Sequence, residues 1–211
     1  MTIPDHITID LLADTSFSRG ESAPGSVDIE IEHDDLGLPC LSGKTLRGLI
    51  RDSWLAMASC FPELCEAGSR VCGPIGDLDE ISILRFGDAQ VDASVREWMA
   101  WAEHRNHHPL SPPAVLEALT DTRSQTSEER STGAPAKNTL RSVRVALRKL
   151  RLSAPLTWIK QPKQQDLRCL ALSVLGTRHI GLGRNRGRGF VRLLLDGNSD
   201  LTRSLARGDR Q

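Results

Sequence analysis

The order of strand-like and helix-like patterns is the feature that most restricts what this chain can fold into. Apolar residues alternate with polar ones over 6–12 and over 27–32, which predicts two half-buried strands, the second with an acidic face. From 45 to about 60 the apolar residues recur at helical spacing, and Ser42 is placed to cap that helix. Residues 81–89 are typical of another strand.

The middle of the chain has less regular patterns. Residues 60–80 are predicted to be irregular, and 94–119 hold helical fragments broken by a stretch rich in His and Pro. Residues 122–138 contain almost no apolar side chain, so we expect a long exposed loop there. Two strands are predicted to follow, over 139–147 and 150–159.

The last third of the chain completes the pattern. Residues 164–177 predict a helix with Gly176 suited to its C-cap, and 190–195 predict a final strand. In order, the chain is strand, helix, strand, insertion, strand, helix and strand, with extra strands. This is the βαββαβ order of an α+β protein with a ferredoxin-like fold and a long central insertion.

Charge is divided unevenly along the chain. The whole chain has 27 basic and 27 acidic residues, yet residues 123–192 carry 16 Lys and Arg against three acidic residues, a net charge of +13. Residues 1–122 carry a net charge of −13. Such asymmetry suggests a polyanionic partner for the basic segment. The alternative is two solvated surfaces of opposite charge that serve solubility.

The strongest local signal is a stretch of glycines and arginines between the last predicted helix and strand. Glycine allows positive φ and a close approach of the backbone to a ligand, and arginine supplies forked donors to phosphate oxygens. The order helix, loop, strand excludes a dinucleotide-binding fingerprint, and the Lys-Ser/Thr pair of a P-loop is missing. Binding to a phosphate backbone therefore fits better than the alternative, a flexible basic hairpin. The stretch contains Gly181, Gly183, Arg184, Arg186, Gly187, Arg188 and Gly189.

A second group of basic residues lies near the start of the first predicted helix. The group consists of Lys44, Arg47 and Arg51. The N-terminal end of a helix carries a partial positive charge, so basic side chains there are unfavourable unless an anion occupies the site. This placement also favours an anionic partner.

Composition excludes several other classes of protein. No window approaches the roughly 18 apolar residues of a membrane span. The first ten residues lack the basic-then-apolar order of a secretory signal. Five cysteines, an odd number, argue against a secreted disulfide framework. We therefore expect a soluble, cytoplasmic protein without a membrane partner.

Taken together, these motifs resemble the RAMP (repeat-associated mysterious protein) superfamily, the RNA-binding subunits of CRISPR effector complexes. The glycine-rich loop before the last strand resembles the signature of that superfamily. Residues 36–53 resemble its G-x-P-x-x-x-G-x-x-L-[KR]-G-x-x-R element, and 81–90 resemble its second core strand. Residues 122–145 resemble the central hairpin insertion of type III subunits, closest to those of subtype III-D.

The resemblance implies a modified RNA-recognition fold and a set of partners. A single domain would span 1–195, with its core in 7–100 and 139–195, an insertion over about 101–138, and a C-terminal tail over 196–211. The implied partners are CRISPR RNA, target RNA and other CRISPR effector subunits. No aromatic residue lies in 7–13 or 81–85, so we expect contacts to the RNA backbone with little base readout. The residues expected to meet RNA are Lys44, Arg47, Arg51, Arg123, Arg141, Arg144, Gly181, Gly183, Arg184, Arg186, Gly187, Arg188 and Gly189.

Whether the chain is an enzyme depends on one loop. Some type III backbone subunits cut target RNA with an acidic residue in the loop after the first strand. The matching loop here offers Glu21, with Asp14 and Asp28 as alternatives close in sequence. Cleavage would be metal-dependent, with Mg²⁺ as the expected ion. A lone surface carboxylate is more often solvated than catalytic, so binding of guide RNA without cleavage is the other reading.

Three cysteines follow the first predicted helix, namely Cys60, Cys65 and Cys72. Some relatives hold a structural zinc in this region, and thiolates are suitable ligands for it. A fourth cysteine and a C-x-x-C pair are missing here. Buried free thiols are therefore the alternative.

A second enzyme class is also related to the superfamily. The endoribonucleases that trim CRISPR precursor RNA carry the same glycine-rich loop, and they use an N-terminal histidine and tyrosine set. This chain has no tyrosine, and His6 stands alone at the first strand. His104, His107 and His108 form a cluster without a partner motif and are expected at the surface.

Overall fold

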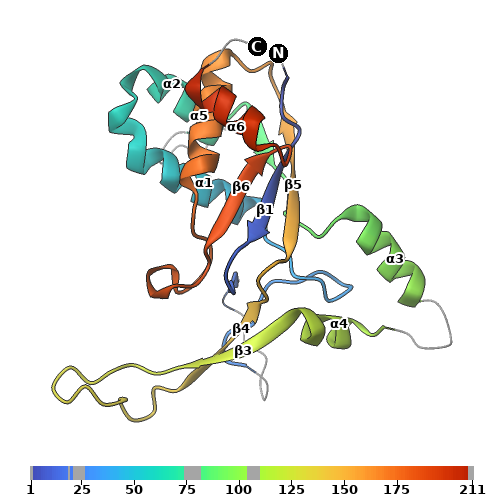
Figure 1. The fold of residues 1–211 in the computed structure, drawn as a ribbon, viewed down its shortest axis with the longest axis vertical. Helices are drawn as coiled ribbons and strands as arrows, with labels where there is room; N and C mark the ends of the chain where they lie inside the picture. The colour runs from blue at the N-terminus through green and yellow to red at the C-terminus, as the bar shows by residue number, and fades with distance from the viewer. Residues whose placement is uncertain (1, 19, 21–26, 74–81, 104–109, 209–211) are drawn as a thin grey trace.

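A computed structural model describes residues 2–18, 20, 27–73, 82–103 and 110–208 of the chain (Figure 1). It has a mixed α+β fold, as the sequence predicts, with two antiparallel sheets. The larger sheet has four strands in the order β2-β5-β1-β6, and every neighbouring pair in it is antiparallel. Its strands are β1 (His6–Leu11), β2 (Leu84–Phe86), β5 (Arg151–Trp158) and β6 (Val191–Leu195).

Four helices accompany this sheet. They are α1 (Gly43–Met57), α2 (Cys65–Cys72), α5 (Gln164–Gly176) and α6 (Ser199–Arg207). Helices α1 and α2 both contact α5, and α6 contacts α5 and β6. The predicted cap of α1 is confirmed, because Ser42 Oγ accepts a hydrogen bond from the Thr45 N–H at 3.4 Å. Within the described part of the chain, no helix combines the length and the apolar character that crossing a bilayer requires.

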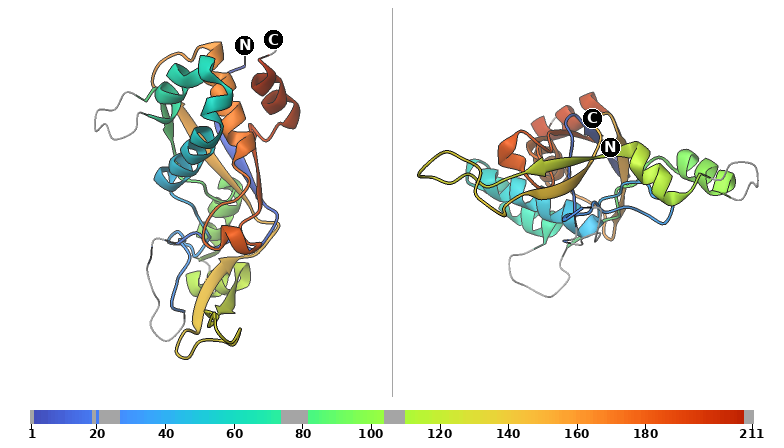
Figure 2. Two further views of the ribbon diagram at one scale, coloured as in Figure 1. Left: turned by 90° about the vertical axis from the view of Figure 1, so that its left-hand side faces the viewer. Right: turned by 90° about the horizontal axis from the view of Figure 1, so that it is seen from below.

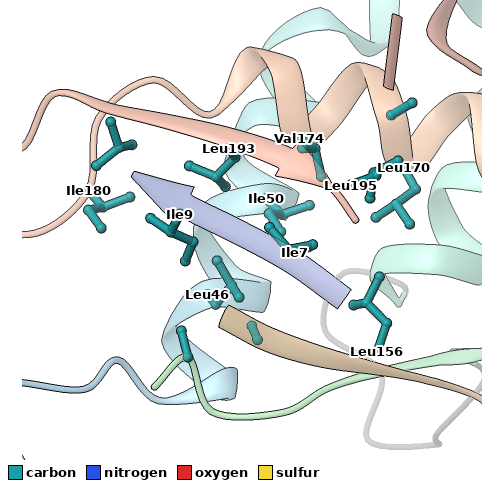
Figure 3. Close-up of a cluster of buried hydrophobic side chains, with 14 of the residues drawn as sticks. Ile7, Ile9, Leu46, Ile50, Leu156, Leu170, Val174, Ile180, Leu193 and Leu195 are labelled. Carbon is teal, nitrogen blue, oxygen red and sulfur yellow. The ribbon is translucent and has the colours of Figure 1, made fainter. Parts of the chain in front are cut away.

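The core lies between one face of the sheet and helices α1 and α5 (Figure 3). The first predicted strand and its apolar face are confirmed, since Ile7, Ile9 and Leu11 are each at most 1% exposed, but the strand is not half-buried, because Thr8 and Asp10 of its other face are buried too. Figure 3 shows Ile7 and Ile9 beside Ile50 of α1 and residues of α5 and β6. Fully burying a side chain of this size contributes about 1.5–3 kcal/mol, so these side chains stabilise the packing of β1 against the helices.

The opposite face of the sheet is polar. Asp10 of β1 lies between two arginines of the neighbouring strands: Arg151 Nε donates to one carboxylate oxygen at 2.7 Å and Arg192 Nη2 to the other at 2.8 Å. Burial acts to raise the pKa of Asp10, but the two guanidinium groups outweigh it and hold the pKa below its ordinary value. The three charges therefore join three neighbouring strands near the end of the sheet at which β1 ends.

A two-stranded arm projects from the end of the sheet at which β1 ends (Figures 1 and 2). The arm consists of β3 (Thr120–Gln125), β4 (Arg141–Ala146) and the tip between them, residues 126–140. Helices α3 (Ala93–Glu103) and α4 (Pro112–Leu119) precede it, as the predicted helical fragments require. Figure 1 shows the tip and helix α3 on opposite sides of the molecule.

Two predictions about the strands are wrong. Residues 27–32 do not form a strand: Ile29 makes a parallel bridge to Val143, with its N–H and C=O bonded to Ser142 and Arg144 of the arm. Residues 122–125 are not loop but part of β3, paired with 141–144. All residues of β3 are polar, so hydropathy carries no signal of this strand, whereas β4 lies within the strand predicted over 139–147.

The helices also differ from expectation in three places. Part of the stretch predicted to be irregular forms α2, and α6 was not predicted at all. Gly176 is not the C-cap: it is the last residue of α5, and the C-cap is Thr177, which has a φ of −79° and is not left-handed. The glycine has a packing role instead: a Cβ at Gly176 would lie 2.4 Å from the terminal methyl carbon of Met57 in α1.

Candidate nucleic-acid interface

The glycine-arginine loop, residues 181–189, links α5 to β6. All four of its glycines have φ between 73° and 76°, in the left-handed region that side chains disfavour. The positive φ expected from the sequence is thus confirmed. Gly183 and Gly187 flank a short 3-10 turn, Arg184–Arg186, which presents the arginines at the tip of the loop.

The loop is fixed to the segment that follows β1. Leu182 N–H donates to the Ser16 carbonyl at 2.7 Å, and Gly189 N–H donates to the Asp14 carbonyl at 3.1 Å. Two glycines make this close approach possible. A Cβ at Gly181 would lie 2.1 Å from the Ser16 oxygen, and one at Gly189 would lie 2.0 Å from the Ile180 oxygen.

The arginines of the loop carry charge that no carboxylate offsets directly. Arg184 and Arg186 are exposed and Arg188 is half-buried. In the described part of the chain, none of the three forms an ion pair. Each guanidinium keeps its N–H groups available to an external anion.

Grooves with both polar and apolar lining residues lie on the two sides of the loop. On the arm side, a groove of about 470 Å³ runs between the loop and the two strands of the arm, with Gln125 and Val143 among its lining residues. On the other side, a groove of about 620 Å³ separates the loop from the end of β1 and from residues 147–149, the turn between β4 and β5. Arg188 lines both grooves. We refer to them as the arm-side and turn-side grooves.

Asp14, one of the candidate catalytic residues, joins the arm to the body of the protein. Its Oδ2 accepts a hydrogen bond from Arg123 Nη2 of β3 at 2.8 Å, and its Oδ1 accepts the Arg148 N–H at 3.2 Å. The Arg123 guanidinium is the largest influence on this carboxyl and lowers its pKa below the ordinary value. Asp14 is therefore ionised at neutral pH and engaged at both oxygens.

The other two candidate carboxylates are placed differently. Asp28 Oδ2 accepts hydrogen bonds from the Ser142 N–H at 2.7 Å and the Ser142 hydroxyl at 2.9 Å, which lower its pKa. Glu21 lies outside the described residues. Among the residues that are described, neither Asp14 nor Asp28 belongs to a group of three His, Cys, Asp or Glu side chains close enough to hold a metal ion.

The predicted RNA-binding arginines of the arm differ in accessibility. Arg141 is exposed in β4, whereas Arg144 has a side chain 15% exposed and pairs with Glu30 at 2.8 Å. Arg123 pairs with Asp14 and also with Asp121, at 2.6 Å. The charges of Arg123 and Arg144 are thus used within the protein, and both side chains help to hold the arm in place.

The start of α1 lies at the same end of the sheet as the loop. Strands β1 and β2 both end there and β6 begins there, and Gly43 at the start of α1 contacts Asp88 shortly after β2. Lys44 and Arg47 are exposed and Arg51 is half-buried. Neither of the two grooves is lined by these residues. The start of α1 already has an anionic partner in the protein, since Asp88 Oδ1 accepts the Gly43 N–H at 2.8 Å.

The three candidate zinc ligands are not brought together. Cys60 and Cys65 are exposed and Cys72 is buried, and burial raises the pKa of the Cys72 thiol to about 12. A thiol must lose its proton to bind zinc, so this environment disfavours Cys72 as a ligand. Across the described residues, the group that meets the distances for a metal ion is Asp5, His6 and Asp196, at the far end of the sheet.

Sequence reasoning missed two features of this interface. It counted Arg148 and Lys149 only as part of the net charge, although both line the turn-side groove. It also considered Asp14 only as a catalytic alternative. The one available signal was the Arg-Lys pair between two predicted strands, where a tight turn exposes both side chains.

Comparison with known proteins gives a likeness of fold. Neither a protein-family model nor a curated protein matches this sequence. A chain from the type III-B Cmr-beta complex bound to cognate target RNA matches with a TM-score of 0.65, over 91% of this chain and 96% of that one, at 14% identity. A chain from the apo state of type III-B Cmr-beta matches with a TM-score of 0.66, over 92% and 97%, also at 14% identity. At this identity the likeness is one of fold: the chain folds like chains of type III-B Cmr-beta complexes.

Proposed function

We propose that this chain is a RAMP-superfamily subunit of a type III CRISPR effector complex that binds CRISPR RNA by its phosphate backbone and positions target RNA for antiviral defence. The observation that carries the proposal is the glycine-arginine loop. Among the described residues, its three arginines have no ion-pair partner, and grooves that are lined in part by these arginines lie on both sides of it. Forked donors on a rigid loop suit phosphate oxygens.

The fold supports the same proposal. The strand order β2-β5-β1-β6, with α1 and α5 packed on one face, agrees with a ferredoxin-like core, which we propose as the fold family. The chains of similar fold come from type III-B Cmr-beta complexes, one of them bound to cognate target RNA. Assignment to subtype III-D and partnership with other effector subunits remain predictions from the sequence.

Binding by this interface is expected to be insensitive to base sequence. The described residues that line the two grooves are arginines, a lysine, glycines, aliphatic residues, Gln125 and Asp14, and none of them is aromatic. Sequence-specific recognition of single strands relies on stacking against aromatic side chains or on hydrogen bonds to base edges. Contacts to phosphates fix position without reading sequence.

The experiment is a salt titration of the full chain with single-stranded RNAs of scrambled sequence. We expect dissociation constants within a few-fold of one another, because phosphates are common to all sequences. The logarithm of the affinity should fall linearly with the logarithm of salt concentration, with a slope of about −0.7 for each phosphate contact. Affinity that does not depend on salt, or a strong preference for one sequence, would contradict the proposal.

Cleavage of target RNA is the second candidate function. The loop that contains Glu21 begins and ends beside the interface: Ser16 bridges to Leu182 of the glycine-arginine loop, and Ile29 bridges to Val143 of the arm. A carboxylate with Mg²⁺ in this region would stabilise the charge that develops on a scissile phosphate.

The test of cleavage uses the assembled complex with guide RNA, labelled complementary RNA and Mg²⁺. If Glu21 is catalytic, regularly positioned cuts in the wild type disappear in Glu21→Ala while target binding is unchanged. Glu97→Ala, which removes an exposed acidic residue from α3, away from the glycine-arginine loop, is the matched control. Absence of wild-type cuts, or cuts that survive in Glu21→Ala, would exclude this role for Glu21.

A further inference from the structure

The turn-side groove contains basic residues that the sequence resemblance does not assign to RNA. We propose that Arg148 and Lys149, with Arg188, form a second contact site for the phosphodiester backbone of single-stranded RNA. The RNA strand would pass from the arm-side groove over the glycine-arginine loop into this groove. The inference rests on the proposed RNA-binding function and adds the path that the strand takes.

The backbone of the turn is held rigidly. Lys149 N–H donates to the Leu11 carbonyl at 2.8 Å, and Leu11 N–H donates to the Leu150 carbonyl at 2.9 Å. Arg148 N–H donates to Asp14 Oδ1 at 3.2 Å. All of these bonds use main-chain N–H groups, so the side chains of Arg148 and Lys149 are not needed to form the turn, and both are exposed.

The conformation of Lys149 indicates that its side chain serves a purpose other than folding. Its φ is 76°, in the left-handed region where a residue with a side chain is strained and glycine is not. Strain of this kind is concentrated at functional sites. A lysine at this turn therefore places a charge in the groove despite a backbone penalty that glycine would avoid.

The charges of the groove favour an anion. Within the described residues, Arg148, Lys149 and Arg188 form no ion pair. The carboxylate that lines the groove, Asp14, already accepts hydrogen bonds at both oxygens, from the Arg123 side chain and the Arg148 N–H. Besides Arg123, which is paired with Asp14, these three cations line an open groove of about 620 Å³, and the shared residue Arg188 connects it to the arm-side groove.

The test compares two variants that each remove one lysine charge. Lys149→Gly is expected to raise the dissociation constant for single-stranded RNA about tenfold, as for loss of one charge-assisted hydrogen bond, and to reduce the salt slope by about 0.7. Lys160→Gly, at the opposite end of β5, should change neither. The melting temperature of Lys149→Gly should equal or exceed that of the wild type, because glycine relieves the strain at this φ.

Two further variants make the test decisive. Lys149→Arg should retain affinity, and Arg148→Gln, which keeps the N–H that Asp14 accepts, should lose affinity as Lys149→Gly does. Equal affinities of Lys149→Gly and Lys160→Gly would overturn the second contact site. If Lys149→Gly has no effect while Ala at Arg184, Arg186 and Arg188 abolishes binding, this inference fails and the proposed function stands. If neither change affects binding, both fail.

Discussion

Replacement of Arg184, Arg186 and Arg188 together by Ala is expected to weaken binding of single-stranded RNA by at least about a hundredfold at low salt. A hydrogen bond to a charged group contributes about 1.5–3 kcal/mol, and the exposure of these arginines reduces that contribution. Three lost phosphate contacts should also make the salt slope shallower by about 2. A filter-binding titration at several salt concentrations measures both quantities.

The matched control for this variant removes three positive charges elsewhere. Arg203 and Arg207 of α6 and Lys160 after β5 are exposed and lie at the far end of the sheet from the loop. Changing these three to Ala should leave the slope nearly unchanged, because charges beyond the Debye length of about 8 Å at physiological salt interact weakly with the bound strand. Equal losses in the two triple variants would mean that net charge, rather than the loop, determines binding.

Gly189→Ala is expected to destabilise the protein by about 3 kcal/mol or more. The new Cβ would lie 2.0 Å from the Ile180 carbonyl oxygen, which belongs to the backbone and cannot move without displacing the loop. A side chain at a φ of 73° adds strain of about 1–2 kcal/mol. In a chain of this size, 1 kcal/mol corresponds to about 2–4 °C, so thermal denaturation should show a decrease of about 6–12 °C.

Gly187→Ala is the control within the same loop. Its φ is 75°, but a Cβ there would meet no heavy atom within 4 Å. This variant should therefore show only the strain of the left-handed backbone, about 1–2 kcal/mol. The difference between the two variants isolates the close packing at the base of the loop. Gly189→Ala should also bind RNA more weakly than the wild type. Equal melting temperatures for the two variants would show that the loop is not fixed as the structure describes.

Several elements follow from local sequence alone. The alternation of Ile7, Ile9 and Leu11 predicts β1, and burial of that face against α1 and α5 agrees with it. Ser42 marks the start of α1, and the glycines of 181–189 predict positive φ. Each of these signals is local: a two-residue period, a capping side chain, or a residue without a Cβ.

Strand β3 of the arm lies beyond such signals. All of its residues are polar, and its pairing with β4 is made by backbone hydrogen bonds that every sequence can form. Residues 27–32 show the same difficulty, because an extended segment with a two-residue period becomes a strand only when a neighbouring strand pairs along its length. Here the backbone-to-backbone hydrogen bonds with the arm involve Ile29, whereas Asp28 and Glu30 contact the arm through their side chains.

The sequence by itself determined the uneven charge and the glycine-arginine composition of the basic segment, and these features predict a partner that carries phosphates. Tertiary structure decided which charges face solvent. Arg123 and Arg144 form ion pairs with Asp14 and Glu30, whereas the side chains of Arg148 and Lys149 are exposed in the turn-side groove. The physical reason is that an ion pair depends on distances between residues more than 100 positions apart, and no local pattern encodes those distances.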